Sequence, residues 1–512
     1  MQQLPMIAGA DSRHTLDALF INAPLRDYTL RPRTNDYTLP VLGMAYIATY
    51  AQQRGFNVGV LDAEAHGLGI EATARIVNEA APRWAAMNLL APTYEMSARI
   101  ADQLEPGIAL MVGGHHAKAM PDRVLADPHM RHLRALVLGE GELRVAALLE
   151  DEQNRHTLPG VLWRDHLLGT RATGIPDPKS SAALLGPDIN SLPYVNRAFL
   201  PQDPYQAAPT VTDRRLAGQR PWLRLISPQG HWEANIVGSR GCPYNCTFCG
   251  AALSANPDVS IRVRSPENII GELDQLYDQY GVTAFRFVDD LFLGVGRVID
   301  EQMDAFTRNK IGDRYVWDAT GRINVLDRLT DADLDRLVTN GLREVALGIE
   351  SGSDRILAAM DKRITAEMTE RVARRLVAHG IGVKGYFILG FPGESRTDLD
   401  ATVRHIRNLW AISDRHTGDV RASVFEFRPY PGTSVWKTLT DEGGYNSDDL
   451  LAYGDVDLTG DGADESMRQC DEFNFSVSIQ FGDVPLTEVR STLAMLTREQ
   501  HQRNQAGMGE AA

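Results

Sequence analysis

Cysteine is scarce in this 512-residue chain, and the few cysteines are not spread along it. Three of the four, Cys242, Cys246 and Cys249, fall within eight residues, and Cys470 stands alone. A disulfide framework needs distributed cysteines, so this clustering argues against one and favours a metal-ligand set. The expected setting is therefore a reducing compartment, the cytoplasm.

Basic residues are fewer than acidic residues, and long hydrophobic runs are absent from the sequence. The chain has 52 lysine and arginine residues against 67 acidic residues, which gives a formal charge of −15. This balance argues against a broad nucleic-acid or anionic-membrane surface. Apolar runs such as 108–112 are strand-sized, well below the roughly 20 residues of a membrane helix. The sequence thus predicts neither nucleic acid nor a membrane as a partner.

The first 150 residues alternate between short apolar runs and helical periodicity. Strands are predicted over 18–22, 58–61, 85–90, 108–112 and 135–138, with helices over 42–54, 70–81 and 95–103. Regular alternation of this kind predicts a doubly wound (Rossmann-like) parallel sheet covered on both faces. In such sheets the ligand crevice lies beyond the carboxyl ends of the strands.

A second alternating block begins at residue 233. Strands are predicted over 235–239, 285–288, 315–319, 344–349, 383–389 and 422–427. Six βα units are too few for a closed eight-fold barrel, so the block predicts an open (βα)6 partial TIM barrel. The expected α/β architecture is a doubly wound domain over 1–158, a proline-rich connector over 159–232, the partial barrel over 233–435, and a small C-terminal domain over 436–512 on the substrate side.

The three clustered cysteines follow the first strand of this second block with the spacing C-x3-C-x2-C. Three thiolates on one short loop can hold three corners of a cubic iron–sulfur cluster and leave the fourth iron open. A structural zinc site would instead need a fourth ligand close by. A fully ligated electron-transfer cluster would need Cys470 from a distant region. The spacing favours the open cluster.

The loop resembles that of the radical S-adenosylmethionine (SAM) superfamily, in which an aromatic residue, here Phe248, precedes the last cysteine. Similar segments follow later strands at 289–290, 321–324, 348–352 and 388–394. The resemblance implies SAM contacts from Phe248, Asp289, Arg322, Glu350, Ser351, Ile388 and Gly390. Asp290 and Cys470 are candidate catalytic residues. Glu394 is equally well explained as a residue that caps the following helix.

The resemblance also implies a reaction. SAM chelates the open iron of a [4Fe-4S] cluster, and one electron cleaves SAM to methionine and a 5′-deoxyadenosyl radical. The cofactors perform this chemistry, while the protein orients them and excludes water. An electron donor such as flavodoxin or ferredoxin is then an expected partner.

The first block resembles the cobalamin-binding domain that precedes the cluster domain in one branch of this superfamily. The similar segments are 61–68, 90–93, 112–117 and 138–142, and they imply cobalamin contacts from Asn22, Thr93, Gly113, Gly114 and His115. The D-x-H-x-x-G segment that supplies a cobalt-ligating histidine in other proteins is missing after the first strand. The resemblance therefore implies cobalamin whose lower face lacks a histidine ligand.

Three functions follow as hypotheses. The first is a cobalamin-dependent radical SAM C-methyltransferase that acts on an unactivated carbon of a specialised metabolite. The second is a non-methylating radical SAM enzyme, such as a cyclase, dehydratase or epimerase, with a repurposed first domain. The third is a non-catalytic zinc or redox-cluster scaffold. The substrate, a small molecule or a carrier-bound group, is not identified by the sequence.

Overall fold

A computed structural model describes residues 6–30, 40–164, 171–173, 186–200, 232–256, 261–455 and 475–509. The chain forms two compact units. Unit 1 consists of Met1–Ala207, Leu253–Ser260 and Tyr430–Gly444, and unit 2 consists of Ala208–Ala252, Ile261–Pro429 and Tyr445–Ala512. Within the described ranges, no helix is both long enough and apolar enough to cross a membrane.

Unit 1 is built on an eight-stranded sheet in the order β1-β3-β2-β4-β5-β6-β7-β8. Its five central strands are parallel: β3 (Val58–Asp62), β2 (Ala18–Asn22), β4 (Trp84–Asn88), β5 (Ala109–Gly113) and β6 (Leu133–Val137). Antiparallel pairing adds β1 (Ile7–Ala8) at one edge and β7 (Val161–Arg164) and β8 (Arg171–Thr173) at the other. The predicted parallel sheet is confirmed.

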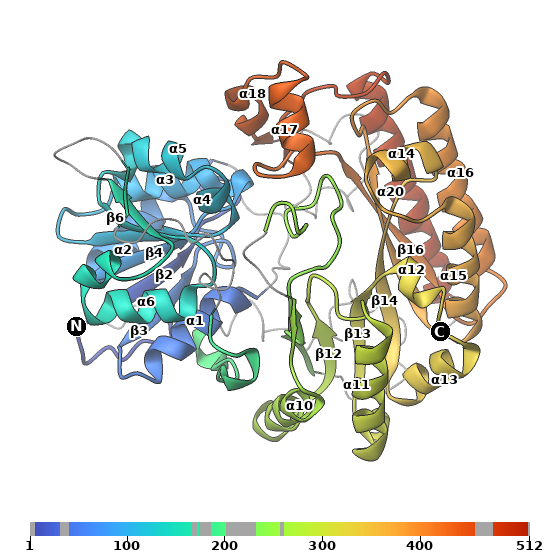
Figure 1. Ribbon diagram of the computed structural model, residues 1–512, viewed down its shortest axis with the longest axis horizontal. Helices are drawn as coiled ribbons and strands as arrows, with labels where there is room; N and C mark the ends of the chain where they lie inside the picture. Colours follow the sequence, from blue (N-terminus) through green and yellow to red (C-terminus); the bar gives the residue numbers. More distant parts are fainter. Residues whose placement is uncertain are drawn as a thin grey trace. The chain divides into compact units, whose positions relative to one another are not determined.

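Helices cover both faces of this sheet (Figure 1). On one face, α2 (Ile70–Ala80) and α3 (Tyr94–Asp102) share a hydrophobic core with side chains of β2 and β3. On the other, α1 (Leu42–Gln52) packs against α6 (Gly141–Glu150). The chain runs from β2 to β3 on one side and then to β4 on the other. This reversal between β2 and β4 is the place where doubly wound sheets bind their ligands.

Unit 2 is built on a six-stranded sheet in the sequential order β16-β15-β14-β13-β12-β9. The strands are β9 (Trp232–Ile236), β12 (Val282–Phe287), β13 (Val316–Gly321), β14 (Leu342–Glu350), β15 (Gly382–Leu389) and β16 (Val420–Glu426). Every neighbouring pair is parallel. Six parallel strands in chain order confirm the predicted open (βα)6 arrangement.

The helices of unit 2 lie on one side of its sheet (Figure 1). They include α10 (Pro266–Tyr280), α11 (Gly296–Arg308), α13 (Asp331–Thr339), α14 (Asp354–Ala359), α15 (Ala366–Ala378) and α16 (Arg396–Ser413). One hydrophobic core joins these helices to the sheet, with Phe287, Trp317 and Phe387 among its most buried members. Burial of this apolar surface is the main force that holds the strands in place.

The C-terminal helix α20 (Leu486–Gly509) packs along β16. Its residues Val489, Leu493 and Leu496 belong to the core of unit 2. The side chain of Gln500 accepts hydrogen bonds from Trp410 Nε1 at 2.9 Å and from the Ala422 backbone N–H at 2.7 Å. The C-terminal part of the chain therefore completes the edge of the barrel.

Candidate active site

The cysteine loop follows β9 and is anchored to the end of α14. The Thr247 backbone N–H donates to Met360 O at 3.1 Å, and Thr247 Oγ1 donates to Ala359 O at 3.2 Å. Cys246 is buried, whereas Cys242 and Cys249 are partly exposed. These contacts hold the loop at the carboxyl ends of the strands.

The three thiols influence each other electrostatically. Burial raises the pKa of the Cys249 thiol to about 11, and the charges of Cys246, Cys242 and the exposed Asp290 contribute to this shift. Burial also raises the pKa of Cys242, and Asp290 contributes there as well. Thiols of this kind lose their protons when a metal binds them.

A [4Fe-4S] cluster fits the chemistry of this donor set, because thiolates are the ligands that such clusters use. Among the residues that the structure describes, no three Cys, His, Asp or Glu side chains converge as a finished metal site. The assignment of a [4Fe-4S] cluster to this site therefore depends on the three thiols and on their position in one loop. Cys470 lies outside the described residues.

Arg322 comes from a distant part of the chain and contacts one of the cysteines directly. It follows β13, and its buried guanidinium donates from Nη1 to Cys246 Sγ at 3.3 Å and from Nη2 to Lys362 O at 2.6 Å. The guanidinium carbon also lies 3.7 Å from the centroid of the Tyr244 ring. Arg322 thus links the cysteine loop to the loop after α14.

Glu350 ends β14 in a left-handed conformation, with φ of +68°. Its carboxylate pairs with a lysine that the sequence did not single out: Lys362 Nζ lies 3.0 Å from Glu350 Oε1, and both side chains are buried. The same ammonium lies 6.0 Å from the centroid of the Phe248 ring. A Cβ at Gly348 would come within 2.3 Å of Glu350 Oε1, so this pair needs glycine there.

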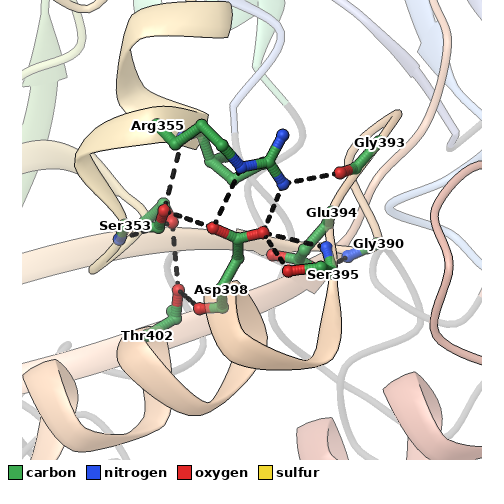
Figure 2. Close-up of polar contacts among 10 residues, drawn as sticks. Ser353, Arg355, Gly390, Gly393, Glu394, Ser395, Asp398 and Thr402 are labelled. Carbon is green, nitrogen blue, oxygen red and sulfur yellow. Dashed lines mark hydrogen bonds and ion pairs between the residues drawn. The ribbon is translucent and has the colours of Figure 1, made fainter.

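The loops after β14 and β15 are tied together by one carboxylate, that of Asp398 in the first turn of α16 (Figure 2). Asp398 accepts hydrogen bonds from Ser353 Oγ at 2.6 Å and from the Ser395 N–H at 2.9 Å, and it forms an ion pair with Arg355. Arg355 also donates to Gly393 O at 2.7 Å. Burial opposes ionisation of Asp398, but these hydrogen bonds outweigh it and hold its pKa well below the usual range.

Glu394 lies in the turn after β15 and is fully buried. One carboxylate oxygen accepts a hydrogen bond from the Gly390 N–H at 2.6 Å, and φ of Gly390 is +79°. The other oxygen, Oε1, has no hydrogen-bond partner among the described residues. Burial raises the pKa of Glu394 to about 7. This oxygen is available to a ligand that donates a hydrogen bond.

Two of the residues predicted to contact SAM form hydrogen bonds with other residues of the protein. Asp289 is buried and accepts hydrogen bonds from the Gly238 N–H at 2.7 Å and from Ser239 Oγ at 3.1 Å, and burial raises its pKa to about 7. Ser351 Oγ lies 3.0 Å from Thr402 Oγ1. Ile388 is half-buried on the face of β15 that points away from the helices. Contact of any of these residues with SAM stays a prediction.

The residues predicted to contact cobalamin gather at the carboxyl edge of the sheet of unit 1. Asn22 at the end of β2 donates to Asp62 Oδ1 at 2.8 Å, and Thr93 follows β4 on the other side of the reversal point. Gly114 has φ of +95°, and a Cβ there would lie 2.0 Å from Asn88 Oδ1. The turn after β5 therefore requires glycine, because a side chain there would collide with Asn88.

The two histidines of this edge differ in their surroundings. His115 is exposed, whereas His116 is buried and its ring centroid lies 4.3 Å from that of Tyr94. Neither ring nitrogen of His116 has a hydrogen-bond partner in the described structure, and burial lowers its pKa to about 4. An orphaned imidazole in the segment after β5, one strand beyond the reversal point, is compatible with a large polar ligand such as cobalamin.

Two family models match the chain. The "B12 binding domain" matches residues 33–149, and the "Radical SAM superfamily" matches residues 236–406. The chain is a member of the radical SAM superfamily that carries an N-terminal B12-binding domain.

Characterised and uncharacterised relatives cover most of the chain. A Pyrococcus horikoshii protein named as an uncharacterized methyltransferase is 27% identical over 407 residues, which is 78% of each chain. The cytidylyl-2-hydroxyethylphosphonate methyltransferase of Streptomyces wedmorensis is 24% identical over 80% of this chain and 79% of its own length. An anaerobic magnesium-protoporphyrin IX monomethyl ester cyclase of Rubrivivax gelatinosus is 23% identical over 76% of this chain and 68% of its own length.

A solved structure shares the fold over nearly the whole chain. The radical SAM methyltransferase TsrM of Kitasatospora setae, solved with cobalamin and a [4Fe-4S] cluster, matches 94% of this chain and 88% of its own with a TM-score of 0.60. Sequence identity in this match is 15%, so the likeness concerns the fold.

Proposed function

We propose that this protein is a cobalamin-dependent radical SAM methyltransferase that adds a methyl group to an unactivated carbon. The observation that carries the proposal is the presence, on one chain, of a three-cysteine loop at the strand ends of a partial barrel and of a doubly wound B12-binding domain. Two of the relatives that cover most of the chain are named as methyltransferases, which supports the same assignment.

When bound, the [4Fe-4S] cluster supplies the electron that cleaves SAM, and cobalamin carries the methyl group. Cys242, Cys246 and Cys249 would hold the cluster. Arg322 would fix the orientation of the loop through Cys246 and place a positive charge beside it. Asn22 and the residues around Gly114 would contact cobalamin.

The carboxyl ends of β14 and β15 would hold SAM. Asp398 fixes the two loops relative to each other, so that a ligand meets a preformed surface. The free oxygen of Glu394 would accept a hydrogen bond from SAM, and the buried pair of Glu350 and Lys362 would order the loop that carries Lys362. The substrate would be a small molecule or a carrier-bound group, and the electron donor a flavodoxin or ferredoxin in a reducing cytoplasm.

A second candidate function is supported by the magnesium-protoporphyrin cyclase among the relatives. In that case the chain would perform radical chemistry without methyl transfer. The test is purification without oxygen, followed by an absorbance spectrum and incubation with reductant, methyl-labelled SAM and a cell extract as the source of substrate. The proposal predicts a corrin spectrum and a product that carries the label. Absence of both, with continued formation of 5′-deoxyadenosine, would favour the second function.

A further inference from the structure

The face of the unit 2 sheet that points away from the helices carries charge. Along β15 the side chains of Val383, Phe387 and Leu389 are buried in the core, and those of Lys384 and Tyr386 are half-buried on the opposite face. Charged side chains on an inner sheet face lose hydration and normally require partners. The partners of each charge therefore show what this face is built for.

Strand register brings five charged residues together on this face. Arg286 of β12 is beside Asp318 of β13, Asp318 is beside Glu344 of β14, and Lys384 of β15 is beside Arg421 of β16. Two pairs form: Arg286 Nε lies 3.4 Å from Asp318 Oδ1, and Arg421 Nη2 lies 2.5 Å from Glu344 Oε2. Each carboxylate of the group thus has an arginine.

Lys384 is the one cation among these five residues that is not in an ion pair. It forms no hydrogen bond or ion pair with any residue that the structure describes, and its Nζ lies 5.1 Å from the centroid of the Tyr386 ring. Burial and the charges of Arg421 and Arg286 lower its pKa to about 8, although the charges of Glu344 and Asp318 oppose this shift. The two carboxylates pair with the arginines and not with Lys384, so this group holds three cations and two carboxylates, and an incoming anion would balance the remaining positive charge.

The position of Lys384 along the strand relates it to the candidate active site. Tyr386 and Ile388 follow it on the same face, and the strand ends at Leu389, directly before Gly390, where the SAM-binding residues are proposed. At about 3.3 Å per residue, Lys384 lies roughly 13 Å before Ile388. Tyr386 lies between these two levels, and its ring centroid is 6.0 Å from that of Phe425, which is beside Ile388 in the sheet.

We propose that Lys384 binds an anionic oxygen of the substrate, that of a phosphate, phosphonate or carboxylate group. Tyr386 and Phe425 contact the part of the substrate between this group and the carbon that reacts. The substrate is then an acid whose anionic group is separated from the methylated carbon by on the order of 10 Å. This inference rests on the proposed function, because it assumes that the reacting carbon lies at the strand ends.

Binding of a simple anion tests the inference without turnover. The oxygen-free holoenzyme is titrated with inorganic phosphate by calorimetry at constant ionic strength, and trimethyl phosphate serves as an uncharged probe of similar shape. We expect phosphate, and not trimethyl phosphate, to bind the wild type, and K384M to weaken phosphate binding at least tenfold. K384R should retain binding because it keeps the charge. K437M, at an exposed lysine of α17 (Ser434–Asp441), is the matched control and should bind as the wild type does.

Equal affinity in the wild type and K384M, or no phosphate binding by the wild type, would overturn the inference. Should K384M fail to fold, K384Q takes its place with the same expectation. Failure here is distinguishable from failure of the proposed function. Labelled methyl transfer without anion binding would support the methyltransferase function and refute an acidic substrate. Anion binding without methyl transfer would support the anion site at Lys384 and refute the methyltransferase function.

Discussion

The ammonium of Lys362 lies 3.0 Å from the carboxylate of Glu350, and both side chains are buried next to the cysteine loop. The two residues are twelve positions apart, and helix α14 lies between them. Their pairing fixes the end of β14 relative to the segment that receives hydrogen bonds from Arg322 and Thr247. The loop that would carry the cluster is therefore supported by a buried ion pair.

Removing one partner of this pair should be costly. In K362M the Glu350 carboxylate stays buried without its counter-ion, and we expect a loss of about 3–5 kcal/mol in the free energy of unfolding. The double variant E350Q/K362M should recover part of that loss because the buried charge is gone. Urea denaturation measures both, with K437M as the control. A K362M variant as stable as K437M would show that the pair does not support the loop.

The Asp398 network should stabilise the chain in a pH-dependent way. D398N loses the charge that pairs with Arg355, and we expect it to be about 2–3 kcal/mol less stable than the wild type at pH 7. Because the folded-state pKa of Asp398 is lowered, its contribution is present above the usual pKa of about 4 and declines as the pH falls below it. Denaturation of both proteins at several pH values measures this difference. The control is D300N, since the exposed Asp300 pairs with Arg336 on the surface. A difference that does not shrink in acid would contradict the assignment.

Glu394 should have the opposite pH dependence. Burial raises its folded-state pKa to about 7, so its contribution to stability is present below the usual value of about 4.5 and is lost as the pH rises through 7. The glutamine of E394Q does not ionise, so this variant does not lose stability through the ionisation of a buried carboxyl group. We expect its stability relative to the wild type to improve by on the order of 1–3 kcal/mol between pH 5 and pH 8. Thermal unfolding at these two pH values checks the prediction. Parallel stability curves for the two proteins would be inconsistent with a buried carboxyl group.

Arg322 should tune the cluster. Its guanidinium contacts Cys246, and loss of a positive charge next to an iron–sulfur cluster makes reduction harder. R322Q should therefore shift the midpoint potential of the reconstituted cluster to more negative values, by on the order of tens of millivolts. Redox titration followed by electron paramagnetic resonance measures the shift. R371Q is the control, because the exposed Arg371 pairs with Asp327. An unchanged potential in R322Q would place Arg322 away from the cluster.

Much of the fold could be predicted from the sequence because the strands of a parallel sheet are continuous apolar runs. The strand at 18–22 has the predicted bounds, and the order of β9 to β16 follows from their regular alternation with helices. The cysteine loop could be predicted because its spacing is local.

The polar network could not be predicted in the same way. Lys362 and Asp398 look like ordinary surface residues in the sequence, since their partners lie on other elements. Lys384 interrupts an apolar strand, and only the register with β16 shows that its neighbour is Arg421 and not a carboxylate. The left-handed conformation of Glu350 and its pairing with Lys362 likewise have no signature in the sequence.

The most direct test of the account is to quantify both products of SAM in one anaerobic reaction. Reduced holoenzyme is incubated with methyl-labelled SAM and a cell extract, and 5′-deoxyadenosine, S-adenosylhomocysteine and labelled product are measured together, with C246A as the control. A cobalamin-dependent radical SAM methyltransferase is expected to form all three in similar amounts, and C246A is expected to form no 5′-deoxyadenosine. Absence of 5′-deoxyadenosine from the wild type, or its undiminished formation by C246A, would contradict the assignment of the three cysteines to a radical SAM cluster.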